Sequence, residues 1–188
     1  MSQITPLIDF LTQLGLNQDA LGVVRENAKR LHGVAGDILL HQGQVQQYGY
    51  FIQSGILKAC HYADKGTSLV KEYYFEGEWC FLYGSWLTQE PAQYQMEVLQ
   101  AAQLIRLPLS LLDRPEWLQV KLVLISQQLI YKEQKEAFFL LNTPEQRYRY
   151  LLEHRANWLT QLNSLQVASY IGISPVSLSR LKARIGSN

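Results

Sequence analysis

The sequence predicts an α+β protein in which N-terminal helices and a jelly-roll-like β-barrel precede a long helix and a small C-terminal helix-turn-helix domain. Three observations predict this class. Glycines concentrate between residues 33 and 84, apolar residues recur at helical spacing over 109–141, and residues 164–183 match two helices joined by a tight turn. The expected domains are residues 1–108, 109–142 and 143–188.

The N-terminal segment is expected to form short helices over residues 1–31, with a break near Gly15. Its apolar residues fall at helical spacing: Ile4, Leu7, Ile8, Leu11 and Leu14. No stretch approaches the roughly 18 consecutive apolar residues of a membrane span, and the first residues lack the basic region and cleavage site of a signal peptide. The protein is therefore expected in the cytoplasm, with no membrane partner. Cys60 and Cys80 should be reduced and buried there.

Many short strands are expected in the middle of the chain, because eight of the twelve glycines lie from Gly33 to Gly84 between stretches rich in tyrosine and aliphatic residues. The clearest hairpin joins residues 56–62 to 67–75 through the turn residues Asp64-Lys65-Gly66. A further strand over 94–107 would complete a barrel of about 70 residues.

Aromatic side chains cluster in this region, and two interpretations stay open. Most of them are expected to be core residues. If some line a cavity, it would suit an uncharged apolar effector. The candidates for such a pocket are Tyr74, Trp79, Phe81, Tyr83 and Tyr94.

The long helix is expected to begin near Leu109, with Pro115 either tolerated in its first turns or marking a restart. Two apolar stripes follow it at 4-3-4 spacing. One is Leu118, Leu122, Ile125 and Leu129; the other is Val120, Leu124, Gln127 and Tyr131. The helix is either buried within its own domain or packs one stripe on the barrel and the other on a second copy of the chain. We favour a homodimer through the first stripe. Thr143 and Pro144 should cap and begin the next helix.

The C-terminal segment has the pattern of two helices crossing at a tight turn. Ala168 is small where the second helix would cross, and Gly172 can adopt the left-handed conformation of the turn. Ser174 then caps the second helix and Pro175 begins it. An ordinary helical hairpin with a cationic end is the plainer alternative.

Charge favours the nucleic-acid interpretation of this segment. Residues up to Asn142 carry 11 basic and 14 acidic side chains, whereas those from Thr143 onward carry 6 and 2. The last basic residues stand in a stretch without acids, which suggests contact with a polyanion. Arginine is suited to guanine edges, and lysine and arginine to phosphates. The DNA-binding candidates are Ser174, Ser177, Ser179, Arg180, Lys182 and Arg184.

This layout resembles the Crp/Fnr superfamily of transcription regulators, which combine a cyclic-nucleotide-binding-like barrel, a dimerisation helix and a helix-turn-helix. The resemblance is firmest in GISPVSLSRLK at 172–182 and GDILLHQGQVQQYGYFIQSGILK at 36–58. It implies a homodimer on an inverted-repeat operator in double-stranded DNA, with Ser177 and Arg180 at base-contacting positions.

One departure from the nucleotide-binding members bears on the effector. Those members hold the ribose and cyclic phosphate with a Gly-Glu pair and an Arg-Ser/Thr pair. Phe81-Leu82 stand near the first place and residues 93–95, Gln-Tyr-Gln, near the second, and no lysine or arginine lies between Lys71 and Arg106. Burying a cyclic phosphate without a cation is costly, so control by cyclic AMP is not expected.

Enzymatic chemistry is not expected. The four histidines are never two residues apart, which disfavours a cupin-type metal site, and no phosphate loop or nucleophile elbow is present. Cys60 and His61 are adjacent on a predicted strand and should point to opposite faces. We therefore expect neither metal nor cofactor. The rival hypothesis is a ligand-binding or protein-interaction module whose helix-turn-helix no longer reads DNA.

Overall fold

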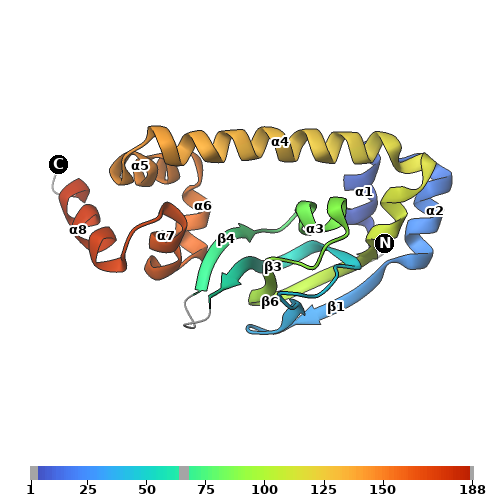
Figure 1. Cartoon of the computed structure of the whole chain (residues 1–188), viewed down its shortest axis with the longest axis horizontal. Coiled ribbons are helices and arrows are strands. Elements are labelled where there is room, and N and C mark those ends of the chain that lie inside the picture. Colours follow the sequence, from blue (N-terminus) through green and yellow to red (C-terminus); the bar gives the residue numbers. More distant parts are fainter. Residues whose placement is uncertain (1–3, 64–67, 187–188) are drawn as a thin grey trace. The chain divides into compact units, whose positions relative to one another are not determined.

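The computed structural model describes residues 4–63 and 68–186. The chain divides into two compact units, one up to Gln128 and one from Leu129 onward (Figure 1). The long helix α4, Leu118–Leu141, contributes residues to both units. The α+β class predicted from the sequence is confirmed.

The N-terminal unit consists of two helices, a sheet and connecting helical turns. Its elements before α4 are α1 Thr5–Gln13, α2 Gln18–Asn27, β1 Lys29–Gly33, β2 Ile38–Leu40, β3 Tyr48–Tyr62, β4 Ser68–Tyr74, β5 Trp79–Cys80, α3 Tyr83–Thr88, β6 Gln95–Pro108, and two 3₁₀ turns at Leu109–Asp113 and Pro115–Trp117. Gly15 has a positive φ of 94° between the first two helices, so the break expected there is confirmed.

The six strands form an antiparallel sheet in the order β1-β6-β3-β4, with β2 paired on β6 and β5 on β3. The long strands β3 and β6 form its centre, and their register pairs Phe51 with Ile105 and Lys58 with Glu97. The register shifts around Gly55, whose φ is 90° and where a Cβ atom would lie 2.4 Å from the carbonyl oxygen of Ala101. A glycine is required there because the two backbones approach too closely for a side chain.

Alternate residues of these strands enter two separate apolar clusters, as the two-residue period of a strand requires. Phe51 and Ile105 pack with the helices on one face, in a cluster that includes Trp79, Phe81 and Trp117. The residues next to them along the strands enter a second cluster on the other face; these are Tyr50, Ile52 and Leu104. Cys80 and Met96 are buried in the same cluster. Cys60 and Cys80 are both free and buried.

Two boundaries predicted from the sequence are wrong. Residues 29–31 were expected to be helical but lie in β1, because Ala28 turns to an extended conformation (ψ 126°) and Lys29 then pairs with Arg106 of β6. The long helix does not begin at Leu109. Arg114, which precedes Pro115, is extended (ψ 145°), so two 3₁₀ turns come first and the α-helix restarts at Leu118.

The hairpin and the last strand agree with the sequence pattern. Residues 56–62 lie in β3 and pair with β4, and the strand expected over 94–107 is β6. The turn residues Asp64-Lys65-Gly66 lie outside the described residues.

The C-terminal unit is helical. It contains the end of α4 followed by α5 Pro144–His154, α6 Ala156–Gln161, α7 Ser164–Ile171 and α8 Pro175–Gly186 (Figure 1). Thr143 caps α5: its Oγ1 accepts from the Gln146 N–H at 3.3 Å and its own N–H donates to the Gln146 side chain at 2.8 Å. Both the cap at Thr143 and the helix start at Pro144 are therefore confirmed.

Candidate DNA-binding surface

Helices α7 and α8 form a helix-turn-helix whose boundaries are determined by local capping. Asn163 caps α7, accepting from the Gln166 N–H at 3.0 Å and donating to its side chain at 2.8 Å. Gly172 ends the helix with φ 76° and ψ 35°. The N–H of Ile173 donates to the carbonyl of Ala168 at 3.0 Å. The left-handed glycine thus closes the last turn of α7 and redirects the chain.

The second helix begins as the sequence predicts. The Oγ of Ser174 accepts from the Ser177 N–H at 3.1 Å, and Pro175 is the first helical residue. Leu178 and Leu181 of α8 are buried, and α8 packs against α7. Ala168 is fully buried, in keeping with the small side chain expected at the crossing.

The six DNA-binding candidates lie on or beside α8 and differ in their exposure and in their contacts. All are exposed except Lys182, which is half-buried. Ser177, Arg180 and Arg184 have the i, i+3, i+7 spacing of one helix face. The Ser177 hydroxyl lies 2.9 Å from that of Ser174. The side chain of Arg180 makes no hydrogen bond or ion pair with any residue that the structure describes. Arg180 is therefore free to contact a ligand.

The other two cations of α8 have partners within the unit. Lys182 donates from Nζ to the Ser164 hydroxyl at 3.0 Å, and its Nζ lies 5.9 Å from the centre of the Tyr148 ring. Arg184 forms an ion pair of 2.6 Å with Glu145 at the start of α5. A hydrogen bond from Arg149 and the charge of Arg184 lower the pKa of the Glu145 carboxyl.

Arg147 connects the helix-turn-helix to the end of α4, and sequence reasoning missed it. Its guanidinium donates to the carbonyls of Phe139 at 2.7 Å, Ile171 at 2.8 Å and Asn142 at 3.1 Å. These carbonyls stand at the C-terminal ends of α4 and α7, where helices leave acceptors without internal partners. One side chain thus caps two helices. The available signal was an arginine in the first turn of α5, where the helix dipole disfavours a cation.

The residues predicted for dimerisation lie along α4. Leu118, Leu122 and Leu129 expose 70, 58 and 61% of their surface, whereas Ile125 is half-buried against the core of the N-terminal unit. Val120 and Leu124 of the second stripe are buried in that core. Gln127, also of the second stripe, is exposed.

The five aromatic candidates for an effector pocket divide between the two faces of the sheet. Trp79 and Phe81 are buried in the helix-covered cluster, and Tyr83 stacks on Phe81 with ring centres 4.3 Å apart. Tyr74 and Tyr94 pack against the second cluster. Trp79 and Phe81 are thus core residues, Tyr83 packs against the same cluster, and the other two lie against the opposite one. Burial raises the pKa of Tyr74.

A buried carboxylate that the sequence did not single out lies on β6, opposite Lys58 of β3. Glu97 accepts hydrogen bonds from Tyr62 at 2.6 Å and from the Cys60 thiol at 3.2 Å, and pairs with Lys58 at 2.9 Å. Burial alone would raise the pKa of Glu97, but these donors together with Gln95 outweigh it and lower the pKa to about 2.

Two searches of the described residues bear on other functions. Within residues 4–63 and 68–186, no group of three or more histidine, cysteine or acidic residues is placed to hold a metal ion. No helix in the described part of the chain is long and apolar enough to cross a membrane.

Comparison with protein families identifies the N-terminal unit. Residues 31–114, from β1 to the first 3₁₀ turn, match the cyclic nucleotide-binding domain family. This segment is a cyclic nucleotide-binding domain. No curated protein matches the chain at significance.

Solved structures extend the comparison to the whole chain, including the C-terminal helices. The c-di-GMP responsive global regulator CLP of Xanthomonas campestris is 14% identical with a TM-score of 0.70, covering 91% of this chain and 92% of that one. FixK2 from Bradyrhizobium japonicum is 13% identical with a TM-score of 0.71, covering 85% of each chain. The catabolite activator protein of Thermus thermophilus is 18% identical with a TM-score of 0.53, covering 92% and 85%. The chain thus has the fold of the Crp/Fnr regulators, including their C-terminal helices.

Proposed function

We propose that the protein is a sequence-specific DNA-binding transcription regulator of the Crp/Fnr type. The observation that carries this proposal is the exposed face of α8, where Arg180 has no partner among the described residues and lies one turn from Ser177. An unpaired guanidinium on the second helix of a helix-turn-helix is suited to the O6 and N7 atoms of guanine. Ser174, Ser177 and Ser179 supply short hydroxyl groups to neighbouring base edges or phosphates.

Lys182 and Arg184 have a different part in this proposal. They lie toward the end of α8, so they would reach the DNA backbone while the first turns of the helix enter the major groove. Both have partners within the unit, Ser164 and Glu145, which are exposed and half-buried respectively. Exposed contacts of this kind contribute little stability, so phosphates can replace them at low cost.

The regulator would act as a homodimer joined along α4. Leu118, Leu122 and Leu129 form an exposed apolar stripe, which a second copy of the chain would cover. The stripe on the other side of α4 is already buried at Val120 and Leu124. A two-fold dimer reads an inverted repeat, with half-sites roughly 34 Å apart.

Cyclic AMP would not control this regulator. Leu82, near the place where nucleotide-binding relatives hold the ribose, has both its backbone groups engaged by the buried side chain of Gln46. The Leu82 N–H donates to Gln46 Oε1 at 2.8 Å, and its carbonyl accepts from Nε2 at 3.2 Å. The interior face of the sheet is filled by the second apolar cluster. No lysine or arginine lies between Lys71 and Arg106, the segment in which those relatives place the arginine that neutralises the cyclic phosphate.

The test is to compare Arg180→Ala with a matched control, Arg25→Ala, which removes an exposed arginine of the N-terminal unit. Footprinting with the wild type first identifies an operator. Labelled operator and scrambled duplex are then titrated at several salt concentrations. Arg180→Ala should reduce the operator-to-scrambled affinity ratio by about 1 to 3 kcal/mol, roughly 5- to 150-fold, and Arg25→Ala should leave it unchanged.

Two outcomes contradict the proposal at different levels. An unchanged affinity ratio in Arg180→Ala would show that Arg180 does not read bases. If the wild type binds neither duplex even at low salt, the regulator hypothesis fails and the interaction-module hypothesis replaces it.

A further inference from the structure

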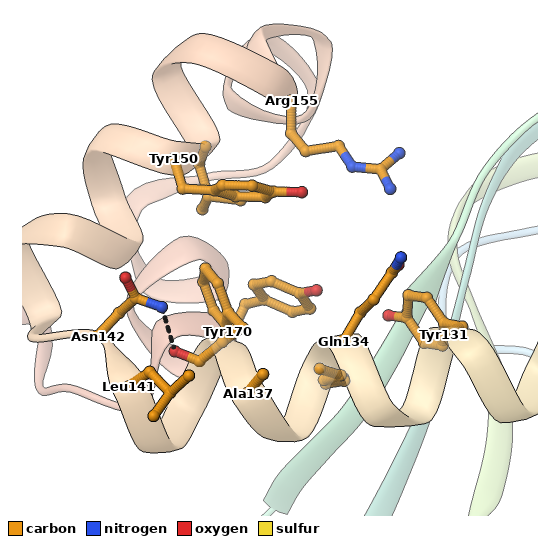
Figure 2. A pocket seen from close by; sticks show the side chains of 11 residues that line it. Tyr131, Gln134, Ala137, Leu141, Asn142, Tyr150, Arg155 and Tyr170 are labelled. Atoms are coloured by element: carbon orange, nitrogen blue, oxygen red, sulfur yellow. Dashed lines mark hydrogen bonds between the residues drawn. The ribbon is translucent and has the colours of Figure 1, made fainter.

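A cavity of about 380 Å³ lies within the C-terminal unit, between the last turns of α4 and helices α5 and α7 (Figure 2). Its volume falls within the range of small-molecule sites in proteins. The helices that form it belong to one compact unit. It is separate from the five aromatic residues that the sequence offered as an effector pocket.

Aromatic rings make up much of the cavity wall. Phe138 of α4 lies with its ring centre 5.4 Å from that of Tyr150 on α5 and 6.3 Å from that of Tyr170 on α7. Figure 2 shows Tyr150 and Arg155 facing Tyr170 and Gln134 across the open space. Rings arranged in this way contact the faces and edges of a planar ligand.

The charge of the lining has one sign. Two cations, Lys135 and Arg155, line the cavity, and none of its lining residues is acidic. Lys135 lies 4.9 Å from the centre of the Tyr170 ring. Arg155 stacks at 5.3 Å over Trp158, and its side chain makes no hydrogen bond or ion pair with the described residues. Its donors are therefore available to an anionic group in the cavity.

We propose that this cavity binds a small planar aromatic anion, with its ring between Tyr150 and Tyr170 and its carboxylate or sulfonate at Arg155. The apolar rings account for the aromatic part of the ligand, and a lining with two cations and no acidic residue accounts for its charge. The proposal concerns the cavity alone and holds whether or not α8 reads DNA.

The binding test uses 8-anilinonaphthalene-1-sulfonate, an aromatic anion that fluoresces when bound, and the neutral N-phenyl-1-naphthylamine as its matched probe. The full chain should bind the sulfonate saturably. Ala137→Trp fills the cavity and should weaken both probes about tenfold or more. Arg155→Gln should weaken only the sulfonate, by about two- to fivefold, because the lost ion pair is solvent-exposed. Arg149→Gln removes an arginine of α5 that does not line the cavity, and should change the binding of neither probe.

Backbone NMR shifts locate the probe independently of any variant. On addition of the sulfonate, shifts should change around Phe138, Tyr150 and Tyr170. Circular dichroism tests whether each variant is folded. If Ala137→Trp is unfolded, the binding of the sulfonate by Arg155→Gln and the map of shift changes test the proposal instead. The proposal is overturned if the sulfonate does not bind, if folded cavity variants bind it like the wild type, or if shifts change only in residues up to 128.

Discussion

The three hydrogen bonds of Arg147 should make it one of the most important side chains for the stability of the C-terminal unit. Arg147→Ala removes donors from the carbonyls of Phe139, Asn142 and Ile171. A hydrogen bond involving a charged group contributes about 1.5 to 3 kcal/mol. The three are not additive, and water can reach some of the freed carbonyls because the site is only partly buried. We therefore expect a loss of about 2 to 4 kcal/mol.

Hydrogen exchange of the backbone amides in α5 and α7 measures this loss within the unit itself. The matched control is Arg149→Ala, two residues along α5. Arg149 pairs with Glu145 at 3.0 Å on the surface, so its removal should cost only about 0.3 to 0.5 kcal/mol. Arg147→Lys should be intermediate, because lysine keeps the charge but cannot reach three carbonyls with one planar group. If Arg147→Ala costs no more than Arg149→Ala, the double-capping role is refuted.

Three further predictions concern other parts of the molecule. Leu122→Glu combined with Leu129→Glu should yield monomers by light scattering, whereas a wild type that is monomeric at micromolar concentration would contradict the dimer. Calorimetry with cyclic AMP and cyclic GMP should show no saturable binding, and a micromolar dissociation constant for either would overturn our interpretation of the sheet interior. The pKa of Glu97 is lowered in the folded state from 4.5 to about 2, so its contribution to stability is complete above about pH 5 and is lost as the pH falls toward 2. Glu97→Gln should flatten that part of the stability curve in acid titrations followed by circular dichroism, and an unchanged curve would rule out this role.

The features predicted correctly from the sequence are those that depend on neighbouring residues. The caps at Thr143 and Ser174 and the left-handed turn at Gly172 each need only a few adjacent positions, so their residue types reveal them. The interruption of the long helix at Pro115 was one of two open alternatives, and it follows from the same local chemistry, although the α-helix itself restarts only at Leu118.

The features missed depend on partners distant in the sequence. Lys29 to Leu31 form a strand because they pair with backbone groups of β6 some 75 positions away. A local sequence pattern does not indicate such a distant partner. Judged by residue type alone, Trp79 and Phe81 could line a pocket or lie in the core. The pairing of β5 with β3 determines which face of the sheet Trp79 occupies, and Phe81 follows directly after β5; both lie in the core. Arg147 is similar, since its three acceptors come from two other helix ends.

The ion pair between Arg184 and Glu145 bears on how strongly DNA binding would depend on salt. A cation that moves from water to a phosphate allows the DNA to release a condensed counterion. Arg184 would leave Glu145 to make such a contact, but the Glu145 carboxylate keeps its ion pair with Arg149 at 3.0 Å. No carboxylate is left uncompensated, so no cation is taken up from solution to offset the release. A phosphate contact by Arg184 would therefore add its full share to the slope of affinity against salt, although the same side chain forms an ion pair in the protein without DNA.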